Sequence, residues 1–440
     1  MSEQNNTVDS MLPVPKLFAY GLQHVLAMYA GAVAVPIIIA QAMHLPVEDL
    51  IRLITADLFT CGIATLIQTI GFGNIGGRIP MIQGVTFAAV GPMAMIGTQH
   101  GMTAIYGAII VAGLFTFLVA PFFSRLIRLF PPVVTGTIIT IIGINLMPVA
   151  VNWMGGGVGS PQFGSLTNIR LGFLTFLIVI FIYKFAKGFI GNLSVLIGLI
   201  AGTAIAFAMG VANFAEVGKA HWVAIIEPFY FGLPTFDWAS VISMIIVMLV
   251  VMVETTGDSI AIGEIVDKKI GRKELASIIR ADGLSTVIGG ILNSFPYTAF
   301  AQNVGLIAVT RVKSRFVVAA SGVILILLGL FPKLAAVVAS IPNAVLGGAG
   351  IAMFGMIIAS GIRSLGKVNF DGNQNLMLVA ISIGVSMIPI AAPTFYAHFP
   401  AWAQILLKSG ITFGSIMAIL LNLLLNGVNK GDEFKEMGRR

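Results

Sequence analysis

Long apolar runs alternate with short polar connections along almost the whole chain. A helix needs about 20 predominantly apolar residues to cross the hydrocarbon core of a bilayer. The pattern therefore predicts an all-α polytopic membrane protein with 14 transmembrane segments, at residues 17–41, 51–71, 80–98, 103–123, 131–150, 170–186, 190–211, 239–263, 277–293, 296–310, 315–331, 334–360, 375–390 and 402–426.

The tenth of these segments is interrupted by polar and helix-breaking residues. The stretch from Phe295 to Gly305 contains Pro, Tyr, Gln and Asn among apolar neighbours. A membrane interior tolerates irregular backbone only where it is buried in protein or lines a cavity. Transporters often build their binding sites from helices that break at mid-depth. The interruption therefore predicts a substrate site near the centre of the membrane.

Proline and glycine positions repeat between the two halves of the chain at an offset of 211 residues. The matched pairs are Pro121 with Pro332, Pro131 with Pro342, and Gly136 with Gly347. The offset spans seven segments, and because seven is odd, the second half would have inverted topology, as in many secondary transporters. The same offset pairs residues 83–90 with 294–301, which predicts short extended breaks in segments 3 and 10. The alternative is chance recurrence among 19 Pro and 50 Gly.

Composition and charge support a membrane protein and exclude other classes. Only 10% of residues are charged and 57% are hydrophobic, whereas a soluble domain carries about 25% charge. The net charge of +7 does not indicate nucleic acid binding, because no basic soluble module is present. With the N-terminus inside, 20 of the 25 Lys and Arg fall on the cytoplasmic side, which predicts cytoplasmic termini. The single cysteine, Cys61, lies in an apolar run, so we expect no disulfide framework and no cysteine-based metal site.

Two carboxyls lie inside the eighth segment. Glu254 and Asp258 are four residues apart and therefore share one helix face. A charged carboxylate at mid-membrane costs at least ~2.5–3.5 kcal/mol, so this face should border protein or a wet cavity. Desolvation favours the protonated form, and a carboxyl that alternates between the two forms is what proton coupling requires. The alternative is a structural carboxyl that is hydrogen-bonded to nearby backbone.

Asp282 and His24 are further polar residues in or beside apolar segments. Asp282 is a second candidate for proton coupling, although it could instead form an ion pair with Arg280 at a helix end. His24 lies early in the first segment and could orient other polar groups or carry protons. A histidine that is simply satisfied within the core is the alternative.

Four residues around the two breaks are candidates for contact with a ligand. The amide of Gln302 both donates and accepts, so it can recognise the edge of a flat heterocycle with N–H and C=O groups. Asn303 follows it, and could instead cap the half-helix 304–309. Thr86 and Phe87 lie in the broken third segment, where Phe87 could stack on an aromatic ligand or only pack.

The run from Gln302 to Arg311 fits a known signature, Gln/Glu-Asn-x-Gly-x4-Thr followed by Arg, Lys or Gly. On this motif, and on the stretches around Glu254, Asp282 and His24, the chain resembles the nucleobase–ascorbate transporter family (nucleobase:cation symporter-2). Within that family it is similar to the bacterial xanthine and uric acid permeases. The resemblance implies proton-coupled purine uptake by a homodimer in the cell membrane, with no cofactor, no metal and no enzyme activity.

The resemblance also implies a domain organisation. Each chain would be a 7+7 inverted repeat that is divided into a core domain and a gate domain. The implied ranges are 17–123 and 239–331 for the core, 124–238 and 332–428 for the gate, a disordered N-terminal tail at 1–16, and a cytoplasmic C-terminal tail at 429–440.

Residue roles follow from the same resemblance. Glu254 would bind the N–H groups of a purine and Gln302 would complete its recognition. The implied substrate-binding set is Glu254, Gln302, Phe87, Thr86, Ala301 and Asn303, and the implied coupling network is Asp282, Asp258 and His24. Members that carry uracil tend to have Glu where this chain has Gln302, which favours xanthine or uric acid as the substrate.

Three other functions remain to be weighed. One is transport of uracil or another nucleobase. Another is a carrier of sulfate or a similar anion with the same architecture, although such a site should offer basic groups and helix N-termini, and Glu254 would repel a dianion. A membrane enzyme is disfavoured because the chain contains no His-Glu-x-x-His, Gly-x-Ser-x-Gly or Asp-rich diphosphate motif.

Overall fold

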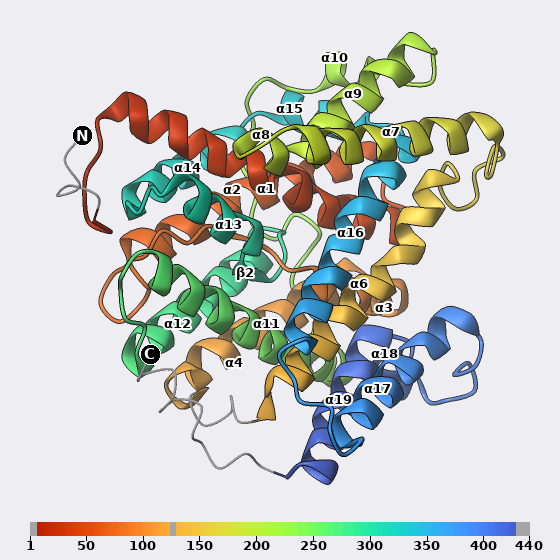
Figure 1. Ribbon diagram of the computed structural model, residues 1–440. Coiled ribbons are helices and arrows are strands. Elements are labelled where there is room, and N and C mark those ends of the chain that lie inside the picture. Colours follow the sequence, from red (N-terminus) through yellow and green to blue (C-terminus); the bar gives the residue numbers. More distant parts are fainter. Residues whose placement is uncertain (1–6, 124–128, 428–440) are drawn as a thin grey trace.

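The computed structural model describes residues 7–123 and 129–427 and is mostly helical over these ranges (Figure 1). Eight of the described helices are long and apolar enough to cross a membrane, and the number rises to ten if each of two sharply bent pairs forms one span. The chain is therefore a multi-pass membrane protein, which confirms the predicted class. The count of 14 segments stays a prediction.

The two halves of the chain share the same order of main helices, with one short strand between the second and third helix of each half. The first half contains α1 (Val14–Ala42), α2 (Val47–Ile70), β1 (Gln83–Val85), the short 3-10 helix η2 (Phe87–Ala89), α3 (Val90–His100), α4 (Met102–Val119), η3 (Ala120–Phe122), α6 (Pro132–Met154), α7 (Leu166–Phe185), α8 (Phe189–Asn192), α9 (Ser194–Ala208) and α10 (Ala215–Lys219). The second half contains α11 (Trp238–Ile265), α12 (Arg272–Ile291), β2 (Tyr297–Ala299), α13 (Ala301–Thr310), α14 (Arg315–Gly329), α15 (Pro332–Ala339), α16 (Asn343–Leu365), α17 (Gln374–Ala391), α18 (Ala401–Leu407) and α19 (Gly410–Leu425).

The helix bounds reproduce the offset that the Pro and Gly positions predicted. Both the first and the last residues of α6 and α16 are 211 positions apart, and so are the first residues of α3 and α13. In α6 and α16 the chain enters the helix through a proline, whose fixed φ suits the first turn. The same local sequence signal therefore starts corresponding helices in the two halves.

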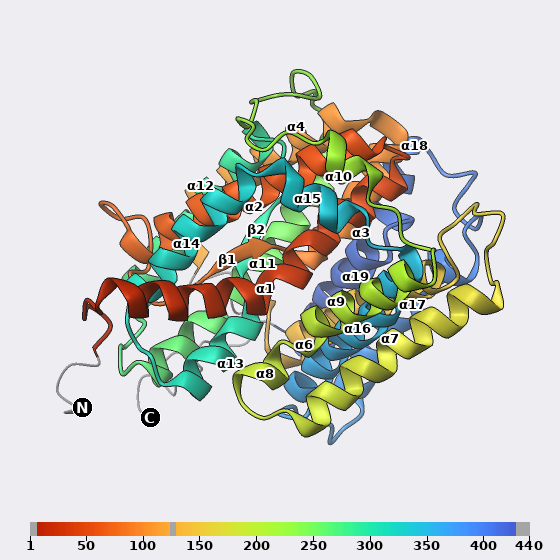
Figure 2. The same cartoon turned by 90° about the horizontal axis from the view of Figure 1, so that it is seen from above.

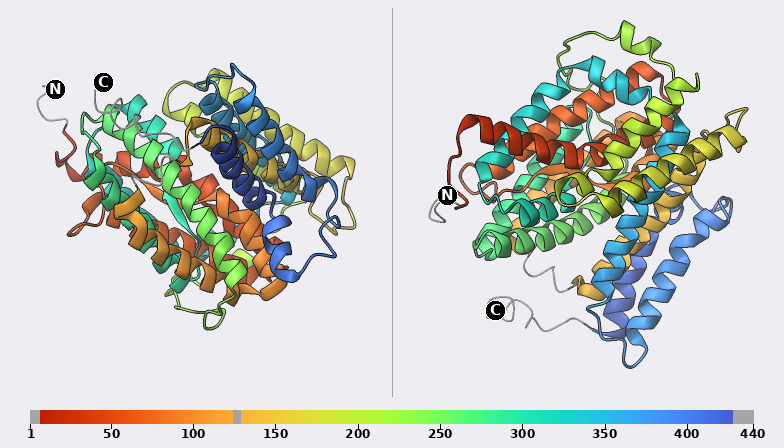
Figure 3. Two further views of the ribbon diagram at one scale, coloured as in Figure 1. Left: turned by 90° about the horizontal axis from the view of Figure 1, so that it is seen from below. Right: turned by 45° about the horizontal axis from the view of Figure 1, so that its top comes forward.

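The helices form two bundles that lie side by side (Figures 2 and 3). We define the first bundle as α1–α4 with α11–α14, and the second bundle as α6, α7, α9, α16, α17 and α19. In the first bundle α2 packs on α14 and α12 packs on α4. In the second, α6 packs on α16, α7 on α9, and α17 on α19. Corresponding helices of the two halves thus make corresponding contacts.

Glycine allows the closest helix crossings of the first bundle. A Cβ atom added to Gly283 of α12 would lie 2.8 Å from the carbonyl oxygen of Gly113 on α4. A Cβ atom on Gly322 of α14 would lie 2.9 Å from the carbonyl oxygen of Gly62 on α2. In a membrane, where water does not drive helices together, small residues allow the close packing that holds them. These two crossings fix the frame that surrounds the breaks.

The two predicted breaks are present and pair with each other. β1 and β2 form a two-stranded antiparallel sheet in which Gln83 lies opposite Ala299 and Val85 opposite Tyr297, and all six residues are buried. Threonine hydroxyls on the neighbouring helices accept from the strand amides, Thr65 from Gln83 (3.0 Å) and Thr286 from Tyr297 (3.1 Å). Each break thereby satisfies backbone groups that a lipid interior would leave unpaired.

The N-terminal segment differs from the predicted disordered tail at 1–16. Residues 14–16 form the start of α1, and residues 7–13 contact the rest of the protein. The Asp9 carboxylate pairs with the Arg315 guanidinium (2.6 Å), and Val8 is buried against apolar residues of α11, α12 and α13. This segment therefore ties the start of α1 to the start of α14. Residues 1–6, and the predicted C-terminal tail at 429–440, lie outside the described residues.

Candidate substrate site at the paired breaks

The open surface of the first bundle lies along α11 and α13, which pack against each other. Ala301 and Gln302 in the first turn of α13 are exposed, although the segment is flanked by buried structure. A Cβ atom added to Gly305, one turn further along α13, would meet no atom within 4 Å. The same is true of Gly257 on α11. Both helices therefore border open space at mid-length rather than closed protein.

Glu254 and Asp258 belong to this open face of α11. Both side chains are half-buried, and the spacing of 254, 257 and 258 places them together on the helix surface. Within residues 7–123 and 129–427 no hydrogen bond or ion pair reaches either carboxyl. The structure thus differs from the alternative of structural carboxyls bound to backbone. Two carboxyls without partners are free to accept from the N–H groups of a ligand.

Asp282 is buried in the middle of α12, and the ion pair with Arg280 that was the alternative to proton coupling is not formed. The Thr255 hydroxyl donates to one oxygen of Asp282 (2.6 Å), and the Gln68 amide lies 3.5 Å from the other oxygen. Arg280 instead donates to the backbone carbonyl of Asn74 (3.2 Å). Thr255 follows Glu254 directly in α11, so Asp282 is linked to the open face through its hydrogen bond with Thr255.

His24 and Asn303 are brought together across 279 residues of sequence. The amide nitrogen of Asn303 donates to Nδ1 of His24 (3.0 Å) and to its backbone carbonyl (2.9 Å). His24 Nδ1 must accept, because the amide nitrogen can only donate, so the ring proton is on Nε2. The capping role considered for Asn303 is wrong, because α13 has no side-chain cap at its start. The pair instead holds α13 against α1 beside Gln302.

Thr86 and Phe87 follow β1 and lie where the two bundles meet. The Thr86 hydroxyl accepts from the amide of Ala88 (3.1 Å) and so caps η2. The half-buried ring of Phe87 contacts Phe354 of α16 edge-on, with ring centroids 5.8 Å apart. Phe87 therefore packs between the bundles and still presents part of its ring outside that contact.

Sequence reasoning missed three polar residues that surround the breaks. Gln68 and Thr255 both contact Asp282, and Asp57 of α2 accepts from Ser294 and Tyr297. Asp57 carries the signal that singled out Glu254, a carboxyl inside an apolar run. The hydroxyl and amide side chains are too common in membrane helices to stand out by sequence alone.

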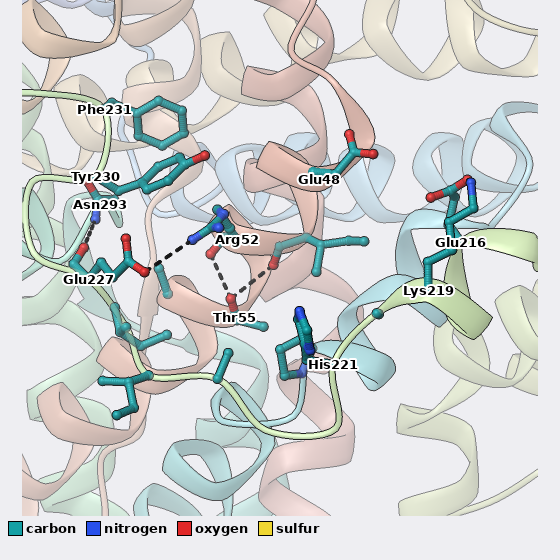
Figure 4. A pocket seen from close by; sticks show the side chains of 17 residues that line it. Glu48, Arg52, Thr55, Glu216, Lys219, His221, Glu227, Tyr230, Phe231 and Asn293 are labelled. Carbon is teal, nitrogen blue, oxygen red and sulfur yellow. Dashed lines mark hydrogen bonds and ion pairs between the residues drawn. The ribbon is translucent and has the colours of Figure 1, made fainter.

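A separate cavity of about 570 Å³ lies at the start of α2, and we call it the outer cavity (Figure 4). The Arg52 guanidinium lies 4.2 Å from the centre of the Tyr230 ring and 3.8 Å from Glu227. Partial burial, together with the hydrogen bond donated to Asp49 (3.0 Å), raises the pKa of the Tyr230 hydroxyl. None of the predicted site residues lines this cavity. Its mixed, exposed charges do not match the site expected for a flat neutral ligand.

Comparison with known proteins places the chain among permeases. The family model described as “Permease family” (Xan_ur_permease) matches residues 15–395. The chain is 46% identical over 421 residues to a xanthine permease of Bacillus subtilis, with 96% of both chains covered. It is 47% identical over 424 residues to the uric acid transporter UacT of Escherichia coli, covering 96% of this chain and 88% of that relative. The resemblance inferred from the motif is thereby confirmed.

Comparison with a solved structure also supports the fold. The transmembrane domain of the cyanobacterial bicarbonate transporter BicA matches with a TM-score of 0.60 at 15% sequence identity, covering 94% of this chain and all of that domain. The TM-score supports a shared fold, whereas an identity this low says nothing about the transported molecule.

Proposed function

The chain belongs to this permease family and is a transporter rather than an enzyme, and we propose that it carries an oxidised purine, xanthine or uric acid, into the cell together with a proton. The observation that carries the proposal is the open face where the unpartnered carboxyl of Glu254 and the exposed amide of Gln302 lie on two helices in contact. The names of the relatives give the substrate class, and the site gives the chemistry.

The chemistry of the proposed substrate fits these side chains. Oxidised purines present adjacent N–H and C=O groups on a flat ring edge. The Glu254 carboxylate can accept from N–H groups, and the Gln302 amide can both donate and accept. The ring of Phe87 offers an apolar surface for stacking. Thr86, Ala301 and Asn303 complete the proposed binding set, with Asn303 held by His24.

Proton coupling is the second part of the proposal. Asp282 and Asp258 are the proposed coupling carboxyls, because Asp282 is joined to α11 through Thr255 and Asp258 shares the open face with Glu254. One proton moving through about 150 mV supplies ~3.5 kcal/mol, at about 2.3 kcal/mol per charge per 100 mV. At about 1.4 kcal/mol per tenfold, this drives roughly 300-fold accumulation of a neutral purine. No cofactor or metal is part of this scheme.

The proposed architecture is a 7+7 inverted repeat with both termini in the cytoplasm, working as a homodimer in the cell membrane. In this proposal seven helices of each half lie in the membrane: α1–α4, α6, α7 and α9 in the first half, and α11–α14, α16, α17 and α19 in the second. The first bundle would be the core domain and the second bundle the gate domain. Alternating access would then consist of movement of one bundle against the other.

Transport of labelled compounds tests the proposal. Cells that express the chain should accumulate labelled xanthine or uric acid, and a protonophore should abolish the accumulation. Uracil and sulfate serve as the competing substrates, and cells that express the Glu254→Gln variant serve as the matched control. Concentrative uptake of sulfate without purine uptake would replace the proposal with an anion carrier. Preference for uracil would change the proposed substrate from an oxidised purine to another nucleobase.

A further inference from the structure

A second buried carboxyl cluster lies beside the paired breaks and has no role in the scheme above. Asp57 is completely buried on α2. One of its oxygens accepts from the Ser294 hydroxyl (3.0 Å) and lies 3.1 Å from the Tyr297 hydroxyl. These two hydroxyls are 2.7 Å apart. Because Tyr297 is the first residue of β2 and Ser294 lies three residues before it, Asp57 holds the chain where it enters the second break.

The hydrogen-bond inventory of this cluster accommodates a proton. Oδ2 of Asp57 is buried and has no partner among the described residues. When the carboxyl is ionised, Ser294 and Tyr297 can both donate to Oδ1 while Oδ2 remains bare. When it is protonated at Oδ1, a chain of bonds can run from Asp57 to Ser294, to Tyr297 and on to the backbone carbonyl of Asp57, which lies 3.2 Å from the Tyr297 hydroxyl. The same three side chains therefore support two different bond patterns.

The outer cavity reaches the residues next to this cluster. Ala56 and Asn293 line the cavity, and they directly precede Asp57 and Ser294 in the chain (Figure 4). Asn293 is buried; its amide nitrogen donates to the Glu227 carbonyl (2.6 Å), and its amide oxygen has no described partner. The wall of the cavity thus includes the residues that directly precede Asp57 and Ser294 in the chain. The titratable groups facing this region are Cys61 and Tyr297 at the cluster, Tyr106 at Asn293, and Glu48, Arg52, Glu216, Lys219, His221, Glu227 and Tyr230 around the cavity.

β2 lies between two buried carboxyls. Asp57 binds its first residue, Tyr297. At the other end the Thr255 hydroxyl, which donates to Asp282, also lies 3.4 Å from the Thr298 hydroxyl and 3.4 Å from the amide of Ala299. A change at either carboxyl therefore acts on a strand of three residues that leads directly into α13.

We propose that Asp57 exchanges a proton with water of the outer cavity and that its protonation state sets the position of β2, and through it of Gln302. Asp57 is a positioning residue, because it does not border the open face of α11 and α13. In the exchange, a hydronium ion in the cavity transfers its proton to a carboxylate oxygen and leaves a water; release reverses both steps. This proposal rests on the proposed purine transport.

The test measures two quantities in the unmodified protein and in variants: the dependence of uptake on pH, and the exchange of substrate at equal pH. Initial uptake of labelled xanthine and uric acid is measured between about pH 5 and 8 outside the cell, with the inside pH held constant. A step that needs one proton changes by up to about tenfold per pH unit. In Asp57→Asn, which cannot release a proton, we expect a flatter profile than that of the unmodified protein, in which only the pH dependence due to Asp282 and Asp258 remains, with exchange at equal pH retained.

A control and one further variant keep the test decisive. Thr60→Val removes a buried hydroxyl of the same helix that donates only to its own backbone (2.8 Å to the Ala56 carbonyl), and should leave the profile unchanged. Tyr297→Phe should shift the profile, and it carries the test if Asp57→Asn does not reach the membrane. If Asp57→Asn, or Tyr297→Phe where Asp57→Asn is not inserted, reaches the membrane in normal amounts and has the pH profile of the unmodified protein, the proposal is overturned. Absence of purine uptake by the unmodified protein would instead refute the proposed function.

Discussion

The two bundles differ most clearly in their carboxyls. Within its helices the first bundle buries Asp57 and Asp282 and half-buries Glu254, Asp258 and, in the first turn of α2, Asp49. The described helices of the second bundle contain no Asp or Glu at all. A carboxyl inside a membrane is retained where it has a function, because its burial is costly. On the proposed function, the chemistry of transport is therefore concentrated in the first bundle, and the second bundle would offer an apolar surface against which the first can move.

The contacts between the bundles are of two kinds. Near the breaks they are aromatic, because the Phe87 ring contacts Phe354 of α16 edge-on, and Phe354 in turn packs beside Trp153 of α6 within the second bundle. At the end of α1 they are polar: the Gln41 amide donates to Asn343 (2.9 Å) and accepts from the Trp153 indole. Apolar rings can slide and repack with little directional preference, whereas the amide contacts must break when the bundles separate at this end. The difference between the bundles predicts that substitutions of the polar residues in the first affect chemistry, whereas substitutions at close helix crossings in either bundle affect packing.

The largest effect is expected for Glu254→Gln. The carboxyl has no partner among the residues that the structure describes, so its loss should leave the fold intact and remove a charged acceptor for the substrate. A hydrogen bond to a charged group contributes ~1.5–3 kcal/mol, so binding should weaken roughly ten- to hundredfold and concentrative uptake should vanish. Labelled-ligand binding and uptake, normalised to the amount of protein in the membrane, measure both. Robust concentrative transport by this variant would refute the role of Glu254.

Asp282→Asn should separate coupling from binding. The amide oxygen can still accept from Thr255, so the contact between α11 and α12 is preserved. If Asp282 carries the proton, accumulation against a gradient should be lost while substrate exchange continues at about half or more of the normal rate. Asp282→Ala, which leaves Thr255 without its acceptor, is the matched control for structural damage. Equal loss of exchange and accumulation in Asp282→Asn would argue for a structural role.

Gln302→Glu should weaken purine transport by about tenfold at neutral pH, because an ionised carboxylate cannot donate and a buried group left unpaired costs ~1–3 kcal/mol. Transport should recover as the pH falls, since the protonated acid donates again. Competition by xanthine, uric acid, guanine and uracil at two pH values is the measurement. An unchanged substrate profile at both would mean that Gln302 does not face the ligand.

The smallest effect concerns packing and changes stability rather than chemistry. Gly283→Ala places a Cβ atom 2.8 Å from the Gly113 backbone and should destabilise the protein by about 1–3 kcal/mol. Gly384→Ala on α17 is the control, because an added Cβ there meets no atom within 4 Å. Thermal unfolding in detergent compares the two. Equal melting temperatures would show that the close α4–α12 crossing does not limit stability.

Much of the fold could be predicted from local sequence signals. The polar residues after Phe295 marked a break because helix-breaking residues in an apolar run have few structural explanations. Prolines at helix starts revealed the repeat because they constrain the first turn wherever they occur. The pairing of β1 with β2 could not be predicted, since it depends on contact between segments more than 200 residues apart.

For the candidate site, the sequence predicted which residues belong to it better than which groups those residues contact. Asn303 has the features of a helix cap, but its partner is His24, which no local pattern reveals. Arg280 is close to Asp282 in sequence, yet the two side chains leave α12 in directions that suit different neighbours, Asn74 and Thr255. Local spacing identifies polar groups, whereas tertiary packing decides which groups they meet.

Protection of an introduced cysteine tests the central claim most directly, because the only native cysteine, Cys61, is buried. Gly305→Cys places a thiol on the open face of α13, and His221→Cys places one at the outer cavity as the control. We predict that xanthine or uric acid slows maleimide labelling of the first thiol and leaves the second unchanged, and that sulfate affects neither. Equal labelling of Gly305→Cys with and without purine, in protein that still transports it, would contradict a binding site on this face.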